Sequence, residues 1–182
     1  MAQPRDLGHE VTIQGSQERG LILHKLMEEV LTGEISDELS ALTDRSAVLI
    51  DQLGKQAANH VASSLSPQEL AGCVVKTLGL AEIQALRPNL LAEFPVYSAQ
   101  ETHGQETASF GIADALALTP EGNPLVVVDW KSDVAPDAKT LDHYRCQVQA
   151  YLEITGAERG LIALMTSGQI IPVVHDGAAG PI

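Results

Sequence analysis

Residues 108–131 constrain the fold most, because they are predicted to form two consecutive β-strands that carry three charged side chains. Asp114 alternates with apolar residues on the first strand, and Asp129 ends an apolar, valine-rich run on the second. Lys131 lies two residues beyond Asp129 and is therefore expected to point the same way. A lone carboxylate on a half-buried strand is costly unless a cation neutralises it. Two carboxylates and an ammonium that converge there predict a divalent metal site.

Alternation along the first strand predicts which side chains share a face. The apolar residues expected on the side of Asp114 are Phe110, Ile112, Leu116 and Leu118. The residues expected on the other side are Gly111, Ala113, Ala115 and Ala117. Such a face of small residues would let a helix approach the sheet closely. Trp130 is expected to point away from Asp129, into packing.

Helices dominate the first half of the chain and strands the second half. The predicted helices are residues 16–33, 37–64, 66–79 and 138–154, of which the first is capped by Ser16 and the third by the capping-box pair Ser66 and Glu69. The predicted strands are residues 90–96, 109–118, 125–130, 161–165 and 169–174, with a polar loop at 99–107. This order predicts an α/β domain with a central mixed sheet, helices on its faces and an N-terminal helical region.

We expect one domain at residues 16–176, in which residues 16–88 form a helical part and residues 89–176 the sheet core. A flexible leader at 1–15 and a tail at 177–182 would flank it. No apolar run approaches the ~20 residues of a membrane-spanning helix, and no signal-peptide pattern opens the chain, so we expect a cytoplasmic protein without a membrane partner. The two cysteines, Cys73 and Cys146, lack the spacing of zinc or iron–sulfur ligands.

The chain is acidic, with 24 Asp and Glu against 11 Lys and Arg and a formal net charge of -13. Proteins that grip nucleic acid by neutralising phosphates are usually basic. Part of the acidic excess belongs to the predicted metal site, and the remainder is expected on exposed helices. The charge therefore leaves little surface for holding DNA without a partner.

Carboxylate oxygens are hard ligands that suit Mg²⁺ or Mn²⁺. A metal ion held there can lower the pKa of a bound water and stabilise charge on a phosphoryl oxygen. Lys131 could position the attacking water, help to deprotonate it or stabilise the transition state. Glu93, on the first predicted strand, is a further carboxylate candidate. His24, on an apolar helix face, could complete the metal shell.

Five motifs together resemble the PD-(D/E)XK nuclease superfamily, and within it the nuclease domain of RecB and AddA helicase–nucleases. In chain order they are a histidine helix at residues 20–28, a first strand at 93–96, a G-x-x-D strand at 111–114, a D-[YW]-K-[ST] signature at 128–132 and a helix with Tyr144, Gln147 and Tyr151. The resemblance spans about residues 17–174. It implies a restriction-endonuclease-like fold.

The resemblance also implies roles for the matching residues. His24, Asp114, Asp129 and the backbone carbonyl of Trp130 would ligate the metal, and Lys131 would be the catalytic lysine. Glu93 and Gln147 would support the metal shell or the DNA backbone, and Gln147, Tyr144 and Tyr151 would contact substrate. The family more often has Tyr where Trp130 stands, which changes little because only the carbonyl is implicated. The cysteines that bind an iron–sulfur cluster in some relatives are absent, so no such cluster is implied. The chain also lacks a phosphate-binding loop motif, so the sequence indicates no ATP site.

The resulting expectation is a Mg²⁺-dependent deoxyribonuclease, exonuclease rather than endonuclease, that acts on linear single- or double-stranded DNA. Its setting would be the nuclease module of a UvrD/Rep-type helicase–nuclease in recombination and repair, with the helicase as partner. Two alternatives stay open: a catalytically inactive nuclease-fold module for DNA or protein docking, and a stand-alone phage-type or restriction-type nuclease.

Each site residue also has a plainer interpretation. His24 could be a hydrogen-bonded core residue, Asp114 a carboxylate bonded to backbone, and Asp129 with Lys131 a simple ion pair. The helix bearing Tyr144, Gln147 and Tyr151 could present one packed face, and Glu93 a solvated charge. These interpretations leave unexplained why all five motifs occur in one order.

Overall fold

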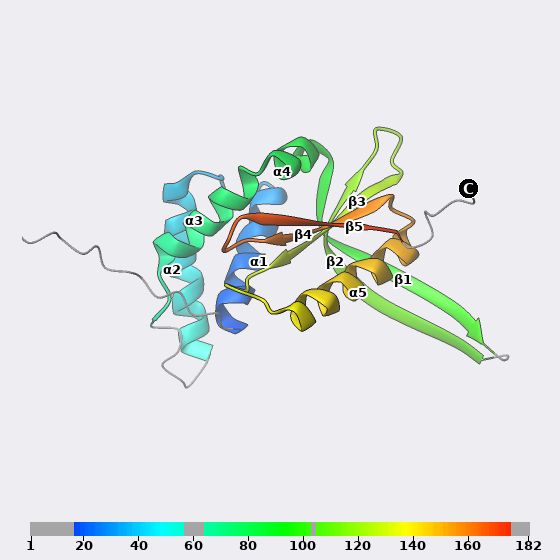
Figure 1. Ribbon diagram of the computed structural model, residues 1–182. Coiled ribbons are helices and arrows are strands. Elements are labelled where there is room, and N and C mark those ends of the chain that lie inside the picture. Colours follow the sequence, from blue (N-terminus) through cyan, green and yellow to red (C-terminus); the bar gives the residue numbers. More distant parts are fainter. Residues whose placement is uncertain (1–16, 57–63, 103–104, 176–182) are drawn as a thin grey trace, which may run out of the picture.

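The computed structural model has one five-stranded sheet with helices on both faces (Figure 1). It describes residues 17–56, 64–102 and 105–175; the predicted leader, the predicted tail and Ser16 lie outside them. The helices are α1 (Gln17–Leu31), α2 (Leu39–Gln56), α3 (Pro67–Leu78), α4 (Ala81–Leu86) and α5 (Ala138–Thr155), with a 3₁₀ turn at Arg87–Asn89. The strands are β1 (Leu90–Thr102), β2 (Gln105–Leu118), β3 (Pro124–Lys131), β4 (Arg159–Leu164) and β5 (Gln169–Val174).

The sheet is mixed, and its strand order follows the chain from β1 to β5. All neighbouring strands are antiparallel except β3 and β4, which run parallel and are joined through α5. A parallel pair requires such a crossover, because the chain must return to the same end of the sheet. The predicted α/β fold with a mixed central sheet and an N-terminal helical region is confirmed.

Two apolar cores hold the layers together. The first lies between α1–α4 and one face of the sheet and contains Trp130, as the alternation predicted. The second lies under α5 and contains Val148 and Leu152 from that helix. A local signal predicted the start of α3 correctly: the Ser66 side chain accepts a hydrogen bond from Glu69 N there, as expected for a capping box.

Two parts of the backbone differ from the prediction. The polar stretch 99–107 was expected to be a loop, yet β1 extends to Thr102 and β2 begins at Gln105, with pairs such as Ala99↔Ala108 and Gln100↔Thr107. This hairpin extends away from the other strands (Figure 1), and so needs no alternating apolar pattern. Helix α4 was not predicted, because it has six residues and Leu80 in place of a capping side chain.

The expected alternation on β2 breaks at Asp114. Ala113 packs in the core under α5, whereas Ala115 packs in the core under the other helices, although regular alternation would place both on one side. Asp114 lines a cavity with α1, while Leu116 faces α5, so the prediction that these two share a face is wrong. The break lies opposite Glu93, which has a φ of 50°. Local irregularity of this kind redirects a side chain.

Within the described ranges, none of the helices combines the length and the apolar character needed to cross a bilayer.

Candidate active site

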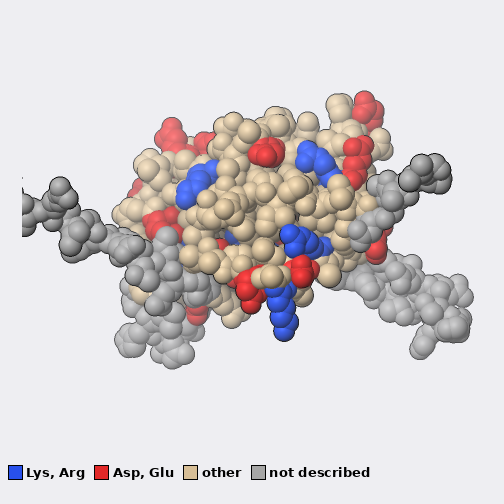
Figure 2. Space-filling view, in the orientation of Figure 1, with Lys and Arg blue, Asp and Glu red and all other residues tan. Residues whose placement is uncertain are grey.

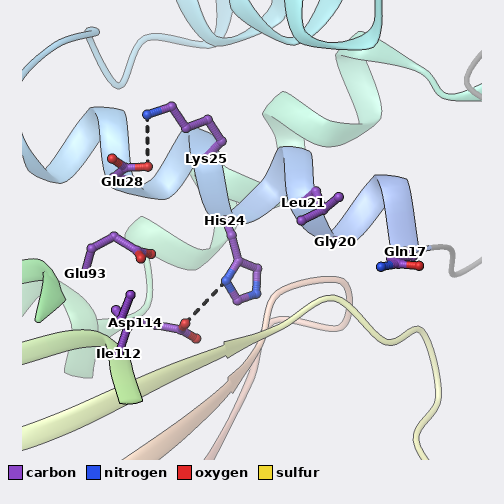
Figure 3. Close-up of a pocket in the computed structure, with 9 residues that line it drawn as sticks. All are labelled: Gln17, Gly20, Leu21, His24, Lys25, Glu28, Glu93, Ile112 and Asp114. Atoms are coloured by element: carbon purple, nitrogen blue, oxygen red, sulfur yellow. Dashed lines mark hydrogen bonds and ion pairs between the residues drawn. The ribbon is translucent and has the colours of Figure 1, made fainter. Parts of the chain in front are cut away.

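Asp114 joins β2 to β3 and to α1. Its Oδ2 accepts a hydrogen bond from Trp130 N at 2.7 Å, beyond the last ladder pair of these strands, Ala115↔Val128. Its Oδ1 lies 3.4 Å from His24 Nδ1 on α1 (Figure 3). Burial lowers the pKa of His24, but the hydrogen bond and the charge of Asp114 outweigh burial, and the net shift is upward. The histidine helix and the G-x-x-D strand, which were predicted to supply ligands to one metal, meet through this direct contact between His24 and Asp114.

Asp129 is the most buried carboxylate of the site, with 1% of its surface exposed. Its Oδ2 lies 2.8 Å from Lys131 Nζ, yet it has no well-oriented hydrogen bond within the described residues. Burial, together with the charge of Asp114, raises the pKa of Asp129 to about 6 despite the opposing charge of Lys131. A buried carboxylate oxygen with unused acceptor capacity is suited to a cation.

Lys131 is oriented from helix α5. Its Nζ donates a hydrogen bond to Gln147 Oε1 at 3.0 Å and lies 4.6 Å from the centre of the Tyr144 ring, within the range of a cation–π contact. Gln147 Nε2 lies 3.4 Å from Tyr151 Oη. Tyr151 in turn donates to the Ile112 carbonyl at 2.9 Å. Gln147 and Tyr151 thus connect Lys131 to β2, while the Tyr144 ring packs against the ammonium.

Glu93 lines the same cavity as His24 and Asp114. Its side chain is exposed. Partial desolvation, and then the charges of Asp114 and Glu28, raise its pKa. Glu93 is therefore near the site, but among the described residues it makes no hydrogen bond or ion pair with the site and is joined to it only through the shared cavity.

A buried ion pair behind the site was not predicted. Arg19 on α1, 1% exposed, pairs with Glu69 at 2.6 Å and donates to the Ser132 carbonyl at 2.6 Å. Ser132 follows Lys131 directly, so this network ties the first turns of α1 and α3 to the end of β3. Arg19 and Glu69 lie 50 residues apart in sequence, and only the burial of an arginine beside the histidine motif could have suggested the contact.

The chemistry of these groups fits a divalent cation, but their side chains do not all lie close enough to one another to surround one. Asp114 and Asp129 supply hard oxygen donors, and Asp129 Oδ2 has spare acceptor capacity. Throughout the part of the chain that the structure describes, however, no three His, Cys, Asp or Glu side chains gather closely enough to hold a metal ion. His24 instead contacts Asp114, and Lys131 contacts Asp129. The plainer interpretations of these residues therefore also describe contacts that are present.

Comparison with protein families matches residues 4–165 to the PD-(D/E)XK nuclease superfamily. No curated protein matches the chain. Among solved structures, one described as "Crystal structure of SSO0001" is similar, with 21% identity, coverage of 88% of this chain and 79% of that chain, and a TM-score of 0.45. The family match covers every candidate site residue from His24 to Tyr151.

Proposed function

The chain belongs to the PD-(D/E)XK nuclease superfamily, and we propose that it is a divalent-metal-dependent deoxyribonuclease that hydrolyses phosphodiester bonds. One observation carries the proposal: the buried carboxylate of Asp129 lies beside Lys131 and within the electrostatic influence of Asp114 and His24. A perturbed carboxylate among such groups at the end of two strands is typical of a catalytic site.

The residues that would hold Mg²⁺ or Mn²⁺ are Asp114 and Asp129, with His24 and the Trp130 carbonyl as further ligands. When bound, the ion supplies positive charge that stabilises negative charge on a phosphoryl oxygen. Asp114 already accepts a hydrogen bond from Trp130 N, which holds its carboxylate at the end of β3. His24 would keep the other oxygen of Asp114 oriented through its Nδ1.

Lys131 would act on the reacting phosphate. An ammonium has three N–H donors, and two are directed toward Asp129 and Gln147. The third can donate to a phosphate oxygen or to the attacking water. Gln147 and the Tyr144 ring fix the direction of that donor, so they would be positioning residues, with Tyr151 supporting Gln147. Glu93 would support the shell from the cavity side.

The order of the motifs supports a narrower setting. We propose a single nuclease domain at residues 16–176, of the RecB/AddA type, that acts as an exonuclease on linear DNA ends beside a helicase domain or subunit in recombination or repair. A basic partner would deliver the strand to this acidic chain. The second candidate is an inactive docking module, which the incomplete gathering of metal-ligating side chains favours.

The test is a cleavage assay on end-labelled linear single- and double-stranded DNA with Mg²⁺, Mn²⁺ or a chelator. We expect metal-dependent degradation by the wild type and a loss of about 10²-fold or more in kcat for Lys131→Ala and Asp114→Ala. Lys139→Ala, an exposed lysine on α5, is the matched control and should behave as wild type. Equal degradation by all proteins would refute the site assignment, and no degradation under any condition would support the inactive module.

A further inference from the structure

A cavity of about 550 Å³ opens beside the candidate active site, between α1 and the first two strands (Figure 3). It shares His24 and Asp114 with that site. Whatever fills it therefore lies next to the reacting phosphate. Apart from Glu93, its remaining walls take no part in the chemistry proposed above.

Two exposed apolar side chains line this cavity from different elements. Leu21 on α1 is 55% exposed and Ile112 on β2 is 44% exposed. Single exposed apolar residues are ordinary. Two that line one cavity beside a catalytic site offer van der Waals surface to a flat apolar ligand.

The charged groups of the cavity are mostly acidic. Glu28, Glu93 and Asp114 contribute carboxylates, and Lys25 is already 3.0 Å from Glu28. A phosphate would be repelled there, whereas a neutral group with N–H donors would be accepted. Glu93 projects into the space between α1 and β2 (Figure 3). Within the part of the chain that the structure describes, no hydrogen bond or ion pair occupies its carboxylate, so its oxygens can accept hydrogen bonds.

We propose that this cavity binds the nucleobase adjacent to the scissile phosphate, an assignment that rests on the proposed function. The base would lie against Leu21 and Ile112, and its exocyclic amino group would donate to Glu93. A base in this cavity has left its stack, so the substrate is a single strand or a frayed end. Thymine lacks an exocyclic amine, and its one base donor, N3–H, lies between two carbonyl oxygens that a carboxylate repels. The cavity therefore favours cytosine, adenine or guanine over thymine.

Homopolymer strands of about a dozen nucleotides test the assignment without knowledge of the cleavage register. We would measure fluorescence anisotropy with oligo-dC, oligo-dT and an abasic strand in Ca²⁺, and cleavage of the same strands in Mg²⁺. The wild type should bind oligo-dC about 10-fold more tightly than oligo-dT, and oligo-dT more tightly than the abasic strand. Equal affinity for all three would overturn the assignment.

Two variants test separately how the apolar walls and the Glu93 carboxylate contribute to binding. Leu21→Ala should weaken binding of oligo-dC several-fold without changing binding of the abasic strand, whereas Leu39→Ala, 54% exposed on α2, should change neither. Glu93→Gln should reduce or reverse the preference for oligo-dC, because its amide N–H can donate to thymine O4. Unchanged discrimination between oligo-dC and oligo-dT in both Leu21→Ala and Glu93→Gln would also overturn the cavity assignment.

The outcomes distinguish the two proposals. Base discrimination without cleavage would refute the proposed function and leave the cavity assignment standing. Cleavage without base discrimination would refute the cavity assignment and leave the proposed function standing.

Discussion

Asp129 illustrates a conflict between stability and chemistry. Its carboxylate is buried under α5, and burial raises its pKa to about 6 even though Lys131 lies 2.8 Å away. The ionised form is therefore less favourable in the folded chain than in water. Under the proposed function this oxygen is kept available for a cation, and the site gives up folding free energy to remain ready for a metal.

We predict that Asp129→Asn stabilises the metal-free protein while abolishing cleavage. In the unfolded chain Asp129 titrates near 3.8, whereas in the folded chain it titrates near 6. Between these two pH values the folded state binds more protons than the unfolded state, so the free energy of unfolding falls as pH rises. The full cost of burying the ionised carboxylate is present above pH 6. The variant should gain on the order of 3 kcal/mol above pH 6 and little well below pH 4. Urea denaturation with chelator, repeated across this pH range, measures the gain.

Asp44→Asn is the control, because Asp44 is exposed on α2, and it should show no such gain. Adding Mg²⁺ should then raise the thermal midpoint of the wild type but not of Asp129→Asn, since binding to the folded state stabilises it. A variant that is less stable than wild type at every pH would show that the Asp129–Lys131 pair contributes more than burial costs.

Helix α1 is fixed to the end of β3 by contacts at its first turn. Arg19 donates to the Ser132 carbonyl, and a Cβ on Gly20 would lie 3.0 Å from Ser132 Oγ. His24 sits about one turn further along α1. The ion pair between Arg19 and Glu69 thereby sets the distance between the histidine and the strand that carries Lys131.

We predict that Arg19→Met destabilises the protein by about 3 kcal/mol, because it leaves Glu69 without its partner in a mostly buried position. Glu69→Gln added to Arg19→Met should recover part of this loss, giving a coupling of about 1 kcal/mol or more in a double-mutant cycle. The exposed pair Arg145 and Asp142 on α5, 2.9 Å apart, provides the matched cycle and should show less than about 1 kcal/mol. Equal coupling in the two cycles would mean that the Arg19–Glu69 pair acts as a surface pair.

Helix α5 approaches the sheet closely at Gly160 on β4. A Cβ at this position would lie 2.2 Å from Val148 Cγ1. We predict that Gly160→Ala destabilises the fold by about 1–3 kcal/mol and that Val148→Ala in the same chain restores part of it. Gly72→Ala in α3 is the control: nothing lies within 4 Å of its Cβ position, and alanine should stabilise the helix by about 0.5–1 kcal/mol. Failure of Val148→Ala to relieve Gly160→Ala in urea denaturation would contradict the close approach.

These elements also show what the sequence could predict. Helix α3 and strand β5 were predicted at or near their bounds, because capping and turn signals are local. Motif order predicted that His24 and Asp114 belong to one site, but not their direct contact. The break of alternation at Asp114 and the Arg19–Glu69 pair were missed because each depends on residues distant in sequence. The long hairpin was missed because its polar stretch has no alternating apolar pattern.

The charge of the chain as a whole bears on how it meets DNA. On the face shown in Figure 2, Lys and Arg are scattered among Asp and Glu and form no continuous basic surface. The formal net charge is -13. Long-range forces therefore oppose the approach of a phosphate backbone, and the site must rely on metal, short contacts or a basic partner.

We predict that kcat/KM of this chain on DNA stays level or rises as K⁺ increases from about 20 to about 150 mM at fixed Mg²⁺, because salt screens the repulsion between chain and DNA. A protein that neutralises several phosphates shows the opposite, a steep loss of affinity with salt. Steady-state cleavage of a single-stranded oligonucleotide at several K⁺ concentrations measures the slope of log kcat/KM against log K⁺.

Cleavage of a dinucleotide, which carries little charge, serves as the control for direct effects of salt on catalysis. A negative slope of several units in log kcat/KM against log K⁺ would reveal a phosphate-binding surface on this chain itself, and would remove the electrostatic reason for a basic partner.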